Sequence, residues 1–81
     1  MKVIVNISLK NGVLDPQGKA LEKALHSLNF NGVKEVKVAK QIQINLDEKD
    51  EKLAKEKVRK MCEELLVNSV IEEYECLIEK E

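Results

Sequence analysis

The residues of this sequence that could take part in chemistry are one histidine, two cysteines and one arginine. His26 lies among leucines on a predicted helix, and we expect a surface or boundary histidine rather than a base. Cys62 and Cys76 fall on the apolar sides of a predicted helix and a predicted strand, where a thiol serves as a small core residue. Structural zinc takes four ligands, which one His and two Cys do not supply. The sequence therefore predicts no catalytic residue and no metal site.

A second candidate is the stretch Asp15, Pro16, Gln17 and Gly18, which has the composition of a helix start. Asp15 can accept hydrogen bonds from the first turn, and Pro16 suits the first helical position because its missing N–H needs no partner there. A helix N-terminus can bind an anion, but the Asp15 carboxylate would repel one. We expect a structural cap that also shapes a partner-facing loop. Glycine costs about 0.5–1 kcal/mol relative to alanine inside a helix, so Gly18 is either a weak helix residue or the point where a partner or another backbone comes close.

Length and charge restrict the class of protein. The 81 residues predict a single domain, residues 1–81, and a domain this small would gain stability from oligomerisation. Residues 1–46 hold seven Lys and three acidic residues, whereas residues 47–81 hold seven Lys or Arg and twelve acidic residues. Bases and acids are interleaved, so we expect no nucleic-acid partner. No apolar run could span a bilayer, and no signal peptide precedes the first strand. We expect a cytoplasmic protein with reduced cysteines and no membrane partner.

Apolar spacing predicts the order strand, helix, strand, strand, helix, strand. An acidic segment, residues 47–50, suits the N-terminus of the second helix because of the helix dipole. Asn29 or Asn31 could take the left-handed conformation that ends the first helix. The expected elements are residues 3–9, 16–28, 36–38, 42–46, about 50–66 and 70–78.

The two middle strands allow two interpretations because their apolar residues are all even-numbered. A three-residue loop, residues 39–41, would pair Val38 with Ile42 in a hairpin. The same parity also suits one long bent strand, residues 33–46. The hairpin is our preferred interpretation.

Right-handed crossovers then place both helices on one face of an antiparallel sheet, which is a ferredoxin-like β-α-β-β-α-β open sandwich of the α+β class. The opposite face would carry few charges, and interface cores are depleted in charge. That face is therefore either covered by a partner or a solvated face that uses amides. Its expected residues are Ile4, Asn6, Ser8, Gln41, Gln43, Asn45 and Leu77.

Proteins with this fold and a known function carry characteristic residues, and this sequence lacks them. A metallochaperone needs cysteines after the first strand, and an RNA-binding domain needs aromatic residues on its central strands. An acylphosphatase-like enzyme needs an arginine in the loop after the first strand, and Arg59 lies on the second helix instead. These comparisons favour a binding or assembly module.

Several strings resemble the PurS subunit family of phosphoribosylformylglycinamidine synthase. The most specific are Asp-Pro-Gln-Gly at residues 15–18 and Asn-Ser-Val-Ile-Glu at residues 68–72. The sequence departs from the family pattern at Asn29 and Ala39, where the family commonly has Gly, and at Ser69, where it has Pro. The resemblance spans residues 9–18, 24–28, 36–40, 61–66 and 68–75.

The resemblance implies a dimeric, non-catalytic subunit in purine biosynthesis that bridges a PurL-like amidating subunit and a PurQ-like glutaminase subunit and supports ammonia transfer. It also implies no cofactor in this chain, because ATP, Mg and glutamine are used by the other subunits of the ligase. The alternative is a ferredoxin-like regulatory module that binds a small metabolite at a dimer interface. A phosphatase-like enzyme is the third option, and the missing loop arginine argues against it.

Overall fold

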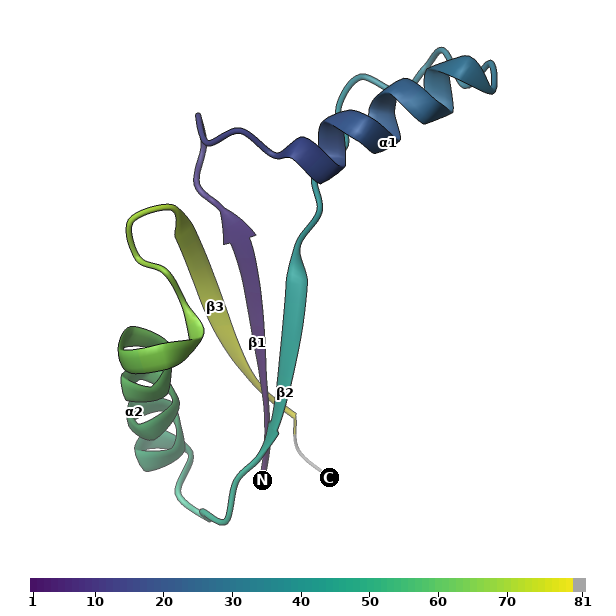
Figure 1. Ribbon diagram of the computed structural model, residues 1–81. Helices are drawn as coiled ribbons and strands as arrows, with labels where there is room; N and C mark the ends of the chain where they lie inside the picture. The colour runs from purple at the N-terminus through teal and green to yellow at the C-terminus, as the bar shows by residue number, and fades with distance from the viewer. Residues whose placement is uncertain (80–81) are drawn as a thin grey trace.

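The computed structural model describes residues 1–79, which form a three-stranded antiparallel sheet, a helix packed on it and a second helix that extends from its end (Figure 1). The strand order is β2-β1-β3. The elements are β1 (Lys2–Leu9), α1 (Pro16–Ser27), β2 (Lys40–Asn45), α2 (Glu51–Met61), the π-helical turn η1 (Cys62–Leu66) and β3 (Glu72–Glu79). The antiparallel sheet and the two helices confirm the predicted ferredoxin-like fold of the α+β class.

The core lies between the sheet and α2. The central strand β1 alternates, so Val3, Val5 and Ile7 are buried on the helix side while the residues between them face the other way. Ala54 and Val58 of α2 and Cys62 of η1 are fully buried, and Val67 is buried beside them. The half-buried side chains that pack around them include Ile42, Ile44, Leu46, Met61, Leu66, Tyr74, Cys76 and Ile78.

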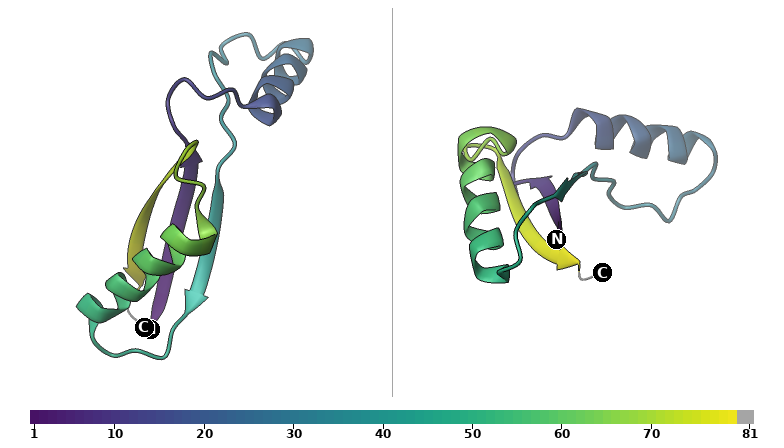
Figure 2. Two further views of the ribbon diagram at one scale, coloured as in Figure 1. Left: turned by 60° about the vertical axis from the view of Figure 1, so that its left-hand side comes forward. Right: turned by 90° about the horizontal axis from the view of Figure 1, so that it is seen from below.

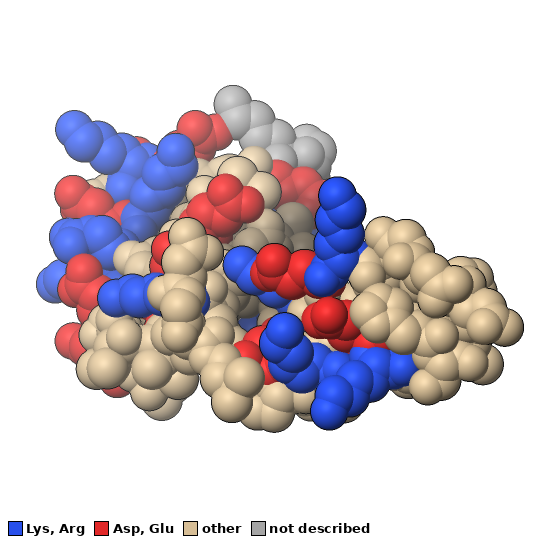
Figure 3. Space-filling view, turned by 90° about the horizontal axis from the view of Figure 1, so that it is seen from above, with Lys and Arg blue, Asp and Glu red and all other residues tan. Residues whose placement is uncertain are grey.

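The expectation of two helices on one sheet face is wrong for α1. This helix and the segment that returns from it, residues 28–39, form an arm that projects beyond the sheet (Figures 1 and 2). The radius of gyration is 16.2 Å, whereas a compact chain of this length would have about 12 Å. Figure 3 shows that the far end of the arm presents few charged side chains.

The preferred hairpin of the two middle strands is also wrong. Only β2 forms, and the chain runs into it from the arm without turning back (Figure 1). The alternative of one bent strand comes closer, although residues 33–39 do not join the sheet. The reason lies in the arm, because the backbone groups of Val36 and Val38 are held against the start of α1 rather than by a neighbouring strand.

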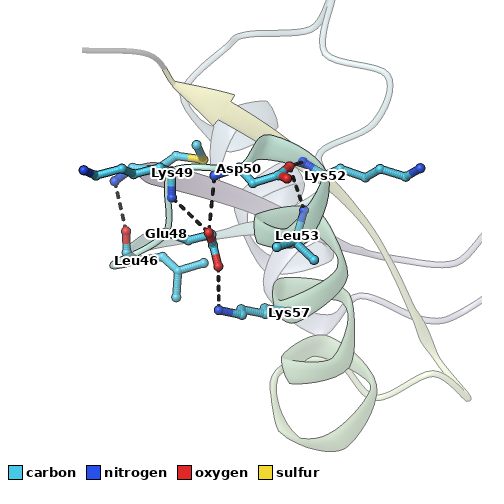
Figure 4. A network of polar contacts seen from close by, with 8 residues as sticks. Leu46, Glu48, Lys49, Asp50, Lys52, Leu53 and Lys57 are labelled. Atoms are coloured by element: carbon cyan, nitrogen blue, oxygen red, sulfur yellow. Dashed lines mark hydrogen bonds and ion pairs between the residues drawn. The ribbon is translucent and has the colours of Figure 1, made fainter.

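The start of α2 confirms the predicted acidic N-terminus (Figure 4). Asp50 is the N-cap, and its carboxylate accepts hydrogen bonds from the N–H groups of Lys52 and Leu53. Glu48 accepts a hydrogen bond from Lys57 Nζ at 2.6 Å and others from the N–H groups of Lys49 and Asp50. The Lys57 ammonium, followed by these N–H groups, lowers the pKa of Glu48. Within residues 1–79, no helix is long and apolar enough to cross a membrane.

Candidate functional site

Asp15 does more than cap α1. Its Oδ1 accepts a hydrogen bond from the N–H of Gly18 at 2.9 Å, which is the predicted cap. Its Oδ2 accepts a second one from the N–H of Val38 at 2.8 Å, and Val38 lies on the returning side of the arm. These two bonds, that of Val38 first, lower the pKa of the Asp15 carboxyl group. One carboxylate therefore fastens both sides of the arm at its base.

Gly18 marks a close approach by the chain's own backbone. It is the one buried residue of α1, and a Cβ added there would lie 2.1 Å from the carbonyl oxygen of Val36. The sequence predicted either a weak helix residue or a close approach by a partner or another backbone, and the structure shows a close approach by the backbone of the same chain. The Asp-Pro-Gln-Gly string is thus explained by the way the arm closes on itself.

The outer end of the arm is closed by one further contact and by the backbone conformation of Asn29. The exposed ring of His26 makes a hydrogen bond through Nε2 to the carbonyl oxygen of Val33 at 2.7 Å, which agrees with the predicted surface histidine. Asn29 has a φ of 72° and ends the helix in the left-handed conformation. The sequence had left this role open between Asn29 and Asn31.

The sheet face opposite α2 carries a row of hydrogen-bonded side chains across all three strands. We call it the amide row: Gln43 donates to Gln41 at 2.8 Å, Gln41 donates to Asn6 at 3.1 Å, and Asn6 donates to Glu75 at 3.4 Å. The pairing of β1 with both neighbours sets this arrangement, since Asn6 lies opposite both Gln41 and Glu75. The predicted amide face is therefore present as a connected network.

This face carries more charge than the sequence suggested. Because Tyr74, Cys76 and Ile78 point toward the core, the alternate residues of β3 lie on the amide face. Three of them are glutamates, and only the outermost has an ion pair within residues 1–79, between Glu79 and Lys2 at 3.7 Å. The remaining candidates also belong to this face, with Ser8 opposite Glu73 and Asn45 opposite Lys2 in the strand register.

The sheet and the arm meet in a hollow of about 330 Å³, which we call the elbow. It brings together Ser8 of the amide face with Asp15, Pro16 and Gln17 of the arm, whereas Gly18 and the amide row lie outside it. A neighbouring hollow of about 280 Å³ on the amide face includes Asn6 and shares Ser8 with the elbow. The other residues that line the elbow are Ile7, Leu9, Val38, Ala39, Lys40 and Glu72.

The two cysteines have the environment of core residues. Cys62 is fully buried, and burial followed by the neighbouring Cys76 raises its pKa to about 11. Burial also raises the pKa of Cys76. Both groups are therefore protonated thiols near neutral pH and poor nucleophiles. Across residues 1–79, no three His, Cys, Asp or Glu side chains come together in a way that could hold a metal ion.

Sequence reasoning missed the exposed apolar surface of the arm. The leucines follow one another at helical spacing, and the structure divides this stripe between a covered and an uncovered part. Leu25 lies on the partly buried side of α1, whereas Leu21 and Leu28 are 49% and 66% exposed. Leu14 and Phe30 are 70% and 56% exposed. Spacing alone does not separate the covered leucine from the exposed ones, because intervals of three and four residues place Leu21, Leu25 and Leu28 on one broad helix side.

The sequence matches a family model along almost its whole length. The model, described as PurS, phosphoribosylformylglycinamidine (FGAM) synthase, matches residues 2–80. The chain is 44% identical over 79 residues to phosphoribosylformylglycinamidine synthase subunit PurS of Bacillus subtilis, covering 98% of this chain and 93% of that protein.

Solved structures give the same result. The crystal structure of Methanocaldococcus jannaschii PurS has a TM-score of 0.89 and 48% identity, covering 98% of this chain and 95% of that one. A chain in the structure of PurLQS from Thermotoga maritima has a TM-score of 0.85 and 36% identity, covering 94% of this chain and 93% of that one. The projecting arm is thus part of a shape that these proteins share along their length.

Proposed function

This chain belongs to the PurS family of phosphoribosylformylglycinamidine synthase subunits, and from that premise we propose that it is the small, non-catalytic subunit of such a synthase in purine biosynthesis. The observation that carries the proposal is the similarity, along 94% of the chain, to a protein in the PurLQS structure. We infer partners of two kinds, a PurL-like amidating subunit and a PurQ-like glutaminase subunit.

The chemistry of the side chains supports a role in assembly. The cysteines are protonated thiols, and the His26 ring is bound to a backbone carbonyl at the surface. We propose that this chain holds no cofactor and that ATP, Mg and glutamine are used by the other subunits. We also propose a cytoplasmic location, where those small molecules are available.

The exposed apolar arm supports self-association into a homodimer or a larger oligomer. Exposed large apolar residues that gather on one element often mark an interaction site, and Leu14, Leu28 and Phe30 of the arm are all more than half exposed. We propose that the amide row and the elbow contact the two large subunits. Through these contacts the subunit would bridge its partners and support the transfer of ammonia between their active sites.

Reconstitution tests this role directly. The two large subunits are assayed with and without this chain, once with glutamine and once with ammonium as the nitrogen donor. We expect glutamine-dependent synthesis to require the chain and ammonium-dependent synthesis to persist without it. Equal glutamine-dependent rates with and without the chain would contradict the proposed function. Co-purification of the three chains provides an independent check on assembly.

A further inference from the structure

Two cysteines meet in the core. Cys62 begins η1 in the helix layer, and Cys76 lies on β3 on the side of the sheet that packs against the core. The strand register places Cys76 opposite Val5, which is fully buried in the same cluster as Cys62. A side-chain hydrogen bond links the two thiols, and both cysteines are free. The fold thus joins η1 and β3 through a pair of adjacent thiols.

The two thiols are not equivalent. Cys62 is fully buried, whereas Cys76 is only half-buried. Burial raises the pKa of both, but their hydrogen bond raises the pKa of Cys62 and lowers that of Cys76, as expected when the Cys62 S–H donates to the Cys76 sulfur. The Glu63 carboxylate further raises the pKa of Cys62, and the Lys55 ammonium lowers that of Cys76. Cys76 is therefore the thiol that ionises more readily and that an external oxidant meets first.

We propose that Cys62 and Cys76 form a modification site, which a small-molecule disulfide such as oxidised glutathione converts into an intramolecular disulfide between η1 and β3. In the first step, the Cys76 thiolate attacks one sulfur of oxidised glutathione, and a glutathione thiolate leaves and takes up a proton. In the second step, the Cys62 thiolate attacks the Cys76 sulfur of this mixed disulfide and releases the other glutathione. The two cysteines lose two electrons and two protons, which reduce oxidised glutathione to two thiols.

The new bond would act on the stability of one edge of the domain. Residues 68–71 of the connection between η1 and β3 are exposed, and a cross-link that closes such a loop restricts the unfolded chain. The amide row lies on the opposite face of the sheet, because neighbouring residues of β3 alternate between faces. The disulfide would therefore clamp η1 to the sheet and leave the amide row unchanged.

Redox titration of the full chain tests the proposal. The native protein is equilibrated with mixtures of reduced and oxidised glutathione, quenched with acid, and analysed by intact mass and peptide mapping. We expect a Cys62–Cys76 disulfide, seen as the loss of two hydrogen atoms, and a melting temperature about 10 °C or more above that of the reduced protein. The proposal would be overturned if the native protein kept both thiols in mixtures that close the disulfide of the urea-unfolded chain, because the folded geometry would then oppose the bond.

Single variants test the order of the two steps. Cys62→Ala leaves the entry thiol without its partner, so a mixed disulfide with glutathione should accumulate on Cys76. Cys76→Ala leaves only the buried thiol, which should stay unmodified in the native protein. Alanine is chosen because it places no new polar group in the core. Glutathione on Cys62 in the second variant, with none on Cys76 in the first, would overturn the proposed order.

A third variant tests whether contact between the thiols is required. Cys62→Ala combined with Ser69→Cys keeps two cysteines, but it moves one of them to the exposed turn before β3. We expect this chain to close an intramolecular disulfide about tenfold or more slowly than the unmodified chain, because the two thiols no longer face each other. Equal rates would overturn the assignment of this pair as a built site.

Discussion

The carboxylate of Asp15 and the backbone N–H of Val38 are joined by a 2.8 Å hydrogen bond, although 23 residues separate them in the chain. The same carboxylate caps α1 through Gly18. The arm therefore closes at its base through one side chain, without packing of α1 on the sheet. A rigid arm can present a fixed apolar surface to another molecule without the entropic cost of ordering a loop.

Replacement of Asp15 by Asn should make the protein less stable at pH 7 and remove a pH-dependent part of its stability. The hydrogen bonds from the N–H groups of Val38 and Gly18 hold the pKa of Asp15 below its ordinary value in the folded state. Its contribution is therefore complete above about pH 4, the ordinary carboxyl pKa, and is lost as the pH falls through the lower folded value. Urea unfolding at pH 7 and pH 3 should show a smaller difference between wild type and D15N at pH 3. A difference that is the same at both pH values would contradict this role.

Replacement of Gly18 by Ala should destabilise the arm, because the new Cβ would meet the Val36 carbonyl oxygen at 2.1 Å. Forcing atoms into a closed contact costs about 1–3 kcal/mol, and the backbone there cannot move without disturbing the Asp15–Val38 bond. Thermal unfolding measures the effect. Gly32→Ala is the matched control, since nothing lies within 4 Å of its added Cβ, and it should be neutral or stabilising by about 0.4–1 kcal/mol. Equal melting temperatures for the two variants would argue against the close contact.

Local sequence signals predicted the parts of the fold that depend on local chemistry. Alternation located β1, and the Asp50 cap and acidic segment located α2. The arm was not predictable in this way, because both the hairpin and the extended segment give the same even-numbered apolar pattern around Val38 and Ile42. What decides between them is the pair of contacts that Val36 and Val38 make with the start of α1, and neither contact leaves a periodic signal.

The candidate site was predictable to a similar degree. Parity alone placed Asn6, Gln41 and Gln43 on one face, and the structure joins them in the amide row. Parity also placed Glu73 and Glu75 there, and the low charge expected of this face did not take them into account. The exposure of the arm leucines was not predicted, because a sequence shows which residues share a helix side but not whether the chain itself covers that side.

The buried thiol of Cys62 should be almost unreactive in the native protein. Burial raises its pKa to about 11, which lowers the thiolate fraction near neutral pH about a hundredfold relative to an ordinary thiol. Alkylation by iodoacetamide at pH 8, followed by mass spectrometry, should be correspondingly slower in buffer than in urea. A Ser69→Cys variant provides an exposed thiol as a control, because Ser69 is exposed. Equal rates for Cys62 in buffer and in urea would show that the site opens freely.

The amide row should matter for assembly with the large subunits more than for the fold. Gln43 is exposed and donates a hydrogen bond to Gln41. Gln43→Glu removes that donor and adds a charge to a face that already carries Glu73 and Glu75. We expect little change in thermal stability, since exposed substitutions usually stay within about 0.5 kcal/mol.

Capture by the large subunits should weaken in Gln43→Glu, because a contact surface would then have to bury an additional unpaired carboxylate. Asn31→Asp is the matched control, since it makes the same amide-to-acid change at an exposed position of the arm. Sedimentation of the isolated chain separates this effect from self-association, which the exposed apolar residues of the arm should maintain in both variants. If Gln43→Glu and Asn31→Asp were captured equally well, the amide row would not be the surface that meets the large subunits, and the elbow would remain as the contact to be tested.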